Sequence, residues 1–123
     1  MAERILLVRM SSLGDVIHAT PVARALKRAL PDCHLTWLAF ARMTAPLQGN
    51  PHLDEIITVP DRPGLSDLLH LWWRLKAAQF TIAIDFEGIL RGAAAAYTSG
   101  AFRRIGKRRT LLEAQFAYNE LVP

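Results

Sequence analysis

A single cysteine, Cys33, is present among the 123 residues. One cysteine excludes an internal disulfide framework, and because no secretory leader is visible, the sequence favours a cytosolic protein. The apolar run that follows Met1 is too short for a signal peptide, and no apolar stretch is long enough to span a bilayer. Repeats, low-complexity tracts and linkers are also lacking, so a single domain is predicted over residues 1–123.

The overall composition is that of an ordinary soluble globular protein. Hydrophobic residues make up 51% of the chain and charged residues 21%, which is enough apolar material for a real core. Fifteen basic residues against eleven acidic ones give a net charge of +4. This mild basic excess favours an anionic partner but does not identify one.

Short apolar runs alternate with helical patterns along the whole chain. Strands are predicted at residues 4–9, 33–39, 55–59, 81–86 and 103–106. Helices are predicted between the first turn and Pro31, and at residues 41–48, 66–78, 88–96 and 111–122. Since strands and helices alternate with short connections, the sequence predicts an α/β fold, a doubly wound, Rossmann-like parallel sheet with helices on both faces.

The start of the first helix has two interpretations because of Pro21. Either Asp15 caps a helix that Pro21 kinks, or Thr20 caps a helix in which Pro21 is the first residue. Helical spacing predicts one apolar face in both cases, formed by Val22, Ala25, Leu26 and Ala29. Cys33 and Trp37, farther along, are predicted to lie in the core, whereas Trp72 and Trp73 are adjacent on a helix and cannot both point inward.

The turn after the first strand has the residues of an α/β binding site. Ser11, Ser12 and Gly14 let a backbone approach a ligand closely, and a helix N-terminus favours an anion. Asp15 is the only carboxylate of the turn and can accept a proton from a substrate hydroxyl. The alternative is that Asp15 is a helix cap and the serines form a turn. His18 lies one helical turn later, where it faces the same cleft or has a structural role.

A second polar turn follows the strand predicted at residues 81–86. Asp85, Glu87, Gly88 and Arg91 lie at or beyond its end, and in a parallel sheet this end shares an edge with the first turn. Two polar strand ends on one edge predict a cleft. The alternative is structural, with Asp85 and Glu87 as helix caps and Arg91 paired with one of them.

Five basic residues lie within seven positions near the end of the sequence: Arg103, Arg104, Lys107, Arg108 and Arg109. Arginine forks suit phosphates, and nucleic acid or an anionic membrane surface would also account for the run. A solvated loop is the common structural meaning of such a cluster. No residues with metal-ligand spacing are evident, so no metal site is predicted.

The first strand and turn, residues 5–18, together with Pro21 and the run Ala25-Leu26-Lys27, resemble the opening of bacterial heptosyltransferases of glycosyltransferase family 9. The segment at residues 85–91 is similar to the family's Asp-x-Gln-Gly-Leu motif. The resemblance implies the N-terminal half of a GT-B fold, in which this acceptor-side domain faces a donor-binding domain across a cleft.

The same resemblance implies the chemistry. Asp15 would be the general base that takes the proton of an acceptor hydroxyl as its oxygen attacks the anomeric carbon of heptose. Ser11, Ser12, Gly14, His18, Asp85, Glu87, Gly88 and Arg91 would bind substrate. Arg62 and the five basic residues would meet acceptor phosphates. The donor would be ADP-heptose, the acceptor a Kdo-lipid A type of lipopolysaccharide core, and no separate cofactor is expected. A cytoplasmic location is implied, with peripheral contact on the inner face of an anionic membrane.

Two departures from the family pattern qualify this interpretation. Glu87 stands where many members have glutamine, and the sequence ends at Val122-Pro123, before a donor-binding domain. We therefore expect the isolated chain to be inactive. Two other classes of function remain: a non-enzymatic α/β module for a ligand or partner, and a nucleic-acid-binding domain that uses residues 103–109. A receiver domain is disfavoured because serines replace the acidic pair after the first strand.

Overall fold

The computed structural model describes residues 2–87, 90–107 and 120–122. Strands and helices alternate as the sequence predicts. The strands are β1 (Arg4–Val8), β2 (His34–Phe40), β3 (Glu55–Val59), β4 (Ile82–Asp85), β5 (Arg103–Lys107) and β6 (Glu120–Val122). The helices are α1 (Leu13–Ala29), α2 (Leu65–Ala77), α3 (Leu90–Thr98) and a 3₁₀ turn, η1 (Ala41–Met43).

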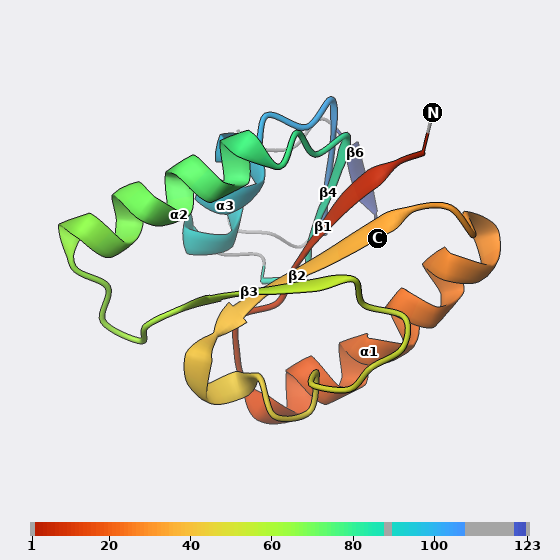
Figure 1. Cartoon of the computed structure of the whole chain (residues 1–123), viewed down its shortest axis with the longest axis horizontal. Coiled ribbons are helices and arrows are strands. Elements are labelled where there is room, and N and C mark those ends of the chain that lie inside the picture. The colour runs from red at the N-terminus through yellow and green to blue at the C-terminus, as the bar shows by residue number, and fades with distance from the viewer. Residues whose placement is uncertain (1, 88–89, 108–119, 123) are drawn as a thin grey trace.

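The strands form one parallel sheet with the order β3-β2-β1-β4-β5-β6. This is the Rossmann order, in which the chain reverses direction across the sheet between β1 and β4. Figure 1 shows α1 on one face of the sheet and α2 and α3 on the other. The predicted doubly wound, Rossmann-like fold is therefore confirmed.

The core lies along the central strands. The side chains of β1 from Ile5 to Val8 are fully buried, as is Trp37 on β2. This continuous burial matches the unbroken apolar character of the first strand, because helices or loops cover both faces. Cys33 is 4% exposed, so its predicted place in the core is confirmed, and burial raises the pKa of its thiol.

The first helix begins before either predicted start. Ser12 is the residue before it, and the helix continues through Pro21 without interruption. Proline has no N–H for the carbonyl of Ile17, and the hydroxyl of Thr20 donates to that oxygen at 2.7 Å instead. The predicted apolar face was partly wrong: Val22 and Leu26 are half-buried, Ala25 and Ala29 are exposed, and the fully buried residues are Val16 and Ala23.

Two other predictions need correction. The helix expected at residues 41–48 is only the η1 turn followed by turns, because Pro46 has no N–H for the carbonyl of Arg42 and disfavours helical backbone at the residue before it. Residues 120–122, expected to be helical, form a strand paired with β5; residues 108–119 lie outside the described residues. The prediction that Trp72 and Trp73 cannot both point inward is confirmed, because both are exposed, by 47% and 67%, and their rings contact edge to face.

No helix in the described part of the chain has the length and apolar character needed to cross a bilayer.

Candidate functional site at the carboxyl edge of β1 and β4

The two polar turns meet at the same edge of the sheet. β1 and β4 are neighbours in parallel register, with Val8 opposite Asp85, so the chain leaves both strands at one edge. This edge is also where the strand order reverses, the place where open α/β sheets bind ligands. The cleft-forming arrangement that the sequence predicts is therefore present.

Asp15 lies in the first turn of α1 and is half-exposed. Its Oδ2 accepts hydrogen bonds from the hydroxyl of Ser12 at 2.9 Å and the backbone N–H of Ser12 at 3.4 Å. The guanidinium of Arg9 lies 2.7 Å from the same oxygen. The Ser12 hydroxyl, the Ser12 N–H and the Arg9 charge lower the pKa of Asp15 below its ordinary value of 3.8. The carboxyl is thus an anion at neutral pH, held at the helix N-terminus.

A small cavity of about 230 Å³ opens beside Asp15, and Arg9, His18 and Phe86 line it with Asp15. Asp15 and His18, which the sequence offers as residues of one cleft, therefore both line this cavity. Arg9 is largely buried and also donates to the carbonyl oxygen of Phe86. A substrate hydroxyl in this cavity would meet a carboxylate, an imidazole and a guanidinium together.

Glu87 holds the turn that carries this carboxylate. Its side chain is only 3% exposed, and Oε1 accepts hydrogen bonds from the backbone N–H groups of Met10 at 2.6 Å and Ser11 at 3.1 Å. Oε2 pairs with Arg91 at 3.0 Å. Arg91 in turn donates to the hydroxyl of Ser11 at 2.9 Å. The two turns are therefore joined by a buried carboxylate and a half-exposed guanidinium.

The structural interpretation of this second turn is confirmed for the pairing of Arg91 with Glu87. Asp85 is 1% exposed and accepts a hydrogen bond from the N–H of Glu87 at 2.7 Å, so it shapes the turn. Arg91 pairs with Glu87, as the same interpretation expects. Gly88 lies outside the described residues. At Gly14, the Cβ of an alanine would meet nothing within 4 Å, so the described fold does not require a glycine at position 14.

The basic residues near the end of the chain are divided between the two edges of the sheet. Arg103 lies opposite Ile82 at the amino end of β4, far from the turns, and its guanidinium binds Glu120 through two hydrogen bonds of 2.8 Å. This pairing raises the pKa of Arg103 and lowers that of Glu120. Arg104 stacks over Tyr97 and donates to the carbonyl oxygen of Ala101. Lys107 ends β5, and Arg108 and Arg109 lie outside the described residues.

Arg62 lies instead at the site's own edge. It is exposed in the loop between β3 and α2, beyond the carboxyl end of β3. Its neighbour Asp61 pairs with Arg42 at 2.7 Å. Among the predicted phosphate contacts, the structure describes the side chains of Arg62, Arg103 and Arg104. Arg62 lies at the same edge of the sheet as Asp15, whereas Arg103 and Arg104 do not.

Sequence reasoning did not assign a role to Arg9 or Phe40. Arg9 is a charged residue directly after a buried apolar strand, which is a local signal for a side chain aimed at the strand end. Phe40 ends β2, and the guanidinium of Arg91 lies 4.9 Å from its ring centroid. That contact joins residues 51 positions apart, so no local pattern indicates it. Within the described residues, no group of three or more His, Cys, Asp or Glu side chains is arranged to hold a metal ion.

The chain is similar in sequence to two curated heptosyltransferases. It shares 33% identity over 102 residues with lipopolysaccharide heptosyltransferase 1 of Pseudomonas aeruginosa, covering 73% of this chain and 28% of that protein. It shares 26% identity over 91 residues with the lipopolysaccharide core heptosyltransferase OpsX of Haemophilus influenzae, covering 74% of this chain and 26% of that protein. The chain therefore spans less than a third of either relative.

The fold is shared with solved structures of glycosyltransferases. A glycosyl transferase family 9 protein from Veillonella parvula superposes with a TM-score of 0.86 at 23% identity, over 98% of this chain and 35% of that one. The Escherichia coli ADP-heptose lipopolysaccharide heptosyltransferase II gives 0.81 at 20% identity, over 98% and 34%. No protein-family model matches the sequence. The resemblance to the heptosyltransferases is confirmed, and the relatives of this chain are glycosyltransferases.

Proposed function

We propose that this chain is the acceptor-side, N-terminal domain of an inverting heptosyltransferase that transfers heptose from ADP-heptose to the lipopolysaccharide inner core. One observation carries the proposal: the half-exposed, ionised carboxylate of Asp15 lines a cavity at the point where the strand order reverses. The similarity to curated lipopolysaccharide heptosyltransferases supports the choice of substrate class.

In the proposed reaction, an acceptor hydroxyl enters the cavity lined by Asp15 and His18. Its oxygen attacks the anomeric carbon of heptose, the bond from that carbon to ADP breaks with its electron pair on ADP, and the hydroxyl proton passes to Asp15. Attack opposite the leaving group inverts the anomeric carbon. The contacts from Ser12 and Arg9 converge on Oδ2, so the proton is assigned to Oδ1.

Positioning matters more than basicity in this arrangement. Hydrogen bonds from Ser12 and the charge of Arg9 lower the pKa of Asp15, which makes it a weak base. A weak base still helps when the acceptor hydroxyl is held against it and its proton becomes acidic only as the new bond forms. The anchoring of the turn by Glu87 fits this requirement.

The donor would bind mainly to a second Rossmann-like domain that faces this one, so we expect no turnover by this chain alone. We also expect no separate cofactor. The acceptor is proposed to be a Kdo-lipid A or heptosyl core, reached by peripheral contact with the inner face of the cytoplasmic membrane. Arg62 is the exposed cation at this edge that is proposed to meet acceptor phosphates. No nucleic acid is expected as a partner.

The test uses a chimera in which this chain replaces the matching segment of the P. aeruginosa relative. With ADP-heptose and a Kdo-lipid A acceptor, we expect turnover by the chimera and none by the chain alone. Asp15→Asn in the chimera should lower kcat by at least 100-fold without changing the melting temperature by more than a few degrees. Turnover by the isolated chain, or full activity of Asp15→Asn, would overturn the assignment.

The control variant is Asp32→Asn, which changes an exposed aspartate after the other end of α1. Activity in this variant should equal that of the parent chimera. If Asp32→Asn and Asp15→Asn lose activity equally, the loss reports general charge or folding and not proton transfer at the cleft.

A further inference from the structure

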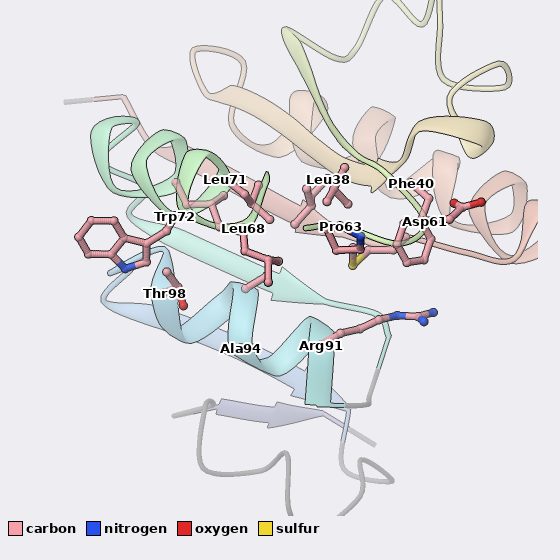
Figure 2. A pocket seen from close by; sticks show the side chains of 14 residues that line it. Leu38, Phe40, Asp61, Pro63, Leu68, Leu71, Trp72, Arg91, Ala94 and Thr98 are labelled. Carbon is pink, nitrogen blue, oxygen red and sulfur yellow. The ribbon is translucent and has the colours of Figure 1, made fainter. Parts of the chain in front are cut away.

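A second and larger cavity lies between the helices α2 and α3 and the sheet (Figure 2). Its volume is about 460 Å³, within the range of small-molecule sites. Its middle is lined by aliphatic side chains, among them Leu38, Leu68, Leu71 and Leu75. These residues have no polar side-chain atom, so whatever fills the middle of this cavity must itself be apolar.

The two ends of the cavity differ in chemistry. Figure 2 shows Trp72 at one end, and Phe40, Asp61 and Arg91 at the other. Asp61 is paired with Arg42, and Arg62 beside it is exposed with no partner among the described residues. The bonds of Arg91 to Glu87 and Ser11 use Nε and Nη2, which leaves the two N–H groups of Nη1 unpaired within the described structure. Asp61 and Arg91 line this end of the cavity, and Arg42 and Arg62 lie next to Asp61 outside the lining. The three arginines outnumber Asp61 and Glu87 by one positive charge.

The cavity is open along α2, where the apolar lining continues onto the surface. Leu68 and Trp72 line it and are each 47% exposed. Leu65, Leu69 and Trp73 extend the same apolar stripe at 74%, 55% and 67% exposure. A helix normally turns such a stripe toward the core, and a contiguous exposed apolar surface marks a binding region.

We propose that this cavity binds the acyl chain of an anionic amphiphile, with the chain along the leucine walls toward Trp72 and the head at Arg91 and Arg62. An acyl chain is the ligand whose middle has no polar atom, and a negative head complements the cationic end. Leucine and tryptophan on an exposed helix also suit a membrane interface, where such lipids are presented. The inference does not depend on the proposed transferase activity, since binding is measured without turnover.

The probe is dodecyl phosphate below its micellar concentration, titrated into this chain and followed by calorimetry and tryptophan fluorescence. We expect saturable one-to-one binding with a blue shift of the emission, as Trp72 is covered. Inorganic phosphate and dodecanol, which supply only the head or only the chain, should each bind at least 10-fold more weakly.

Ala94 on α3 lines the cavity yet is itself exposed, so Ala94→Phe fills the cavity without disturbing the buried core. Ala77→Phe is the matched control, since Ala77 is an exposed alanine on α2 that does not line the cavity. We expect Ala94→Phe to weaken binding at least 10-fold and Ala77→Phe to bind like the parent. Thermal melts of both variants establish that they are folded.

Four results would overturn the proposal. They are non-saturable partitioning of dodecyl phosphate, equal affinity of Ala94→Phe and the parent, binding of inorganic phosphate as tight as that of dodecyl phosphate, and a dimer that must dissociate before binding. The last two would point to a free phosphate site and to a second copy of the chain as the occupants. Arg91→Met tests the contact with the phosphate head separately from the contact with the acyl chain. We expect this variant to weaken the binding of dodecyl phosphate but not that of dodecanol.

Discussion

The side-chain oxygen Oε1 of Glu87 accepts a hydrogen bond from the backbone N–H of Met10 at 2.6 Å, although 77 residues separate them along the chain. The same oxygen accepts the N–H of Ser11. The side chain of Glu87 is almost fully buried, and both hydrogen bonds are partly buried, so its carboxylate is the built-in acceptor for the two N–H groups. The turn that presents Asp15 is therefore held in place from β4, and not by its own residues alone.

Removing this carboxylate should loosen the Asp15 turn. In Glu87→Ala, two backbone N–H groups lose their acceptor, and each unsatisfied buried group costs about 1–3 kcal/mol. Glu87→Gln keeps a carbonyl oxygen for Met10 and Ser11 but loses the ion pair with Arg91. We expect amide hydrogen exchange at Met10 and Ser11 to accelerate strongly in Glu87→Ala and only slightly in Glu87→Gln. NMR of this chain measures both.

The kinetic counterpart uses the chimera. Glu87→Ala should lower kcat more than it raises KM, and Glu87→Gln should restore most of kcat, since the turn keeps its anchor. A purely structural role would instead lower the melting temperature of both variants while leaving kcat per folded molecule unchanged, and that outcome would contradict positioning.

The anchoring by Glu87 also shows where prediction from sequence stops. Local patterns predicted the first five strands, their parallel pairing and the shared edge of the two polar turns, because apolar runs and turn residues report on nearest neighbours in the chain. They offered Glu87 as a substrate-binding residue or as a cap for its own helix. Its contact with Met10 depends on β1 and β4 being neighbours in the sheet, which only the tertiary fold determines.

Helix α2 shows a second limit. Its apolar residues have helical spacing, and the periodicity predicted an amphipathic helix correctly. Periodicity gives an apolar arc but not which part of that arc meets the sheet. In the structure Leu75 is buried, whereas Leu65 and Trp73 face solvent. Similarly, α1 buries Val16 and Ala23, and the predicted positions Ala25 and Ala29 are exposed.

Gly14 offers a test of close approach by a ligand. A Cβ there would meet open space, and alanine favours a helix more than glycine does, so Gly14→Ala should raise stability by about 0.5 kcal/mol. In the chimera, the added methyl group should lower kcat/KM if substrate approaches the turn. The expected result is a higher melting temperature with lower activity.

Gly100→Ala is the contrasting variant for this prediction. Gly100 has a φ of +75°, which alanine adopts at a cost of about 1 kcal/mol. We expect that variant to melt at a lower temperature than the parent. Unchanged activity in Gly14→Ala would mean that nothing approaches the turn closely during the reaction.

The pH dependence of Asp15 can be measured on this chain by carboxyl-carbon NMR titration. The Ser12 hydroxyl is the largest cause that lowers its pKa below 3.8, so Ser12→Ala should raise the pKa toward that value. Ser66→Ala, an exposed serine on α2, should leave it unchanged. In the parent sequence, the lowered pKa keeps Asp15 ionised above about pH 5. The kcat/KM of the chimera should therefore show no acidic limb from this residue between pH 5 and 8. A limb in that range that disappears in Asp15→Asn would contradict the prediction.

Asp54 joins α1 to the edge of the sheet opposite the candidate site. Its Oδ2 accepts hydrogen bonds from Lys27 at 2.7 Å and from the N–H of Leu35 at 2.8 Å. Burial opposes ionisation, but the bonds from Lys27 and Leu35 outweigh it and lower the pKa of Asp54 below 3.8. Since the carboxyl is partly exposed, Asp54→Ala should cost about 1–2 kcal/mol at pH 7 and not the full value of a buried charged pair.

The sign of the pH effect follows from the lowered pKa. The contribution of Asp54 to stability is complete above pH 3.8, the ordinary value, and is lost as the pH falls through the folded-state pKa. Urea unfolding of the parent and of Asp54→Ala should therefore differ at pH 7, and the difference should shrink as the pH falls below 3.8. Asp32→Ala, at an exposed aspartate close by, should match the parent throughout. A difference between parent and Asp54→Ala that does not shrink at any acid pH where the parent still folds would show that packing, and not the ionised carboxylate, accounts for the loss.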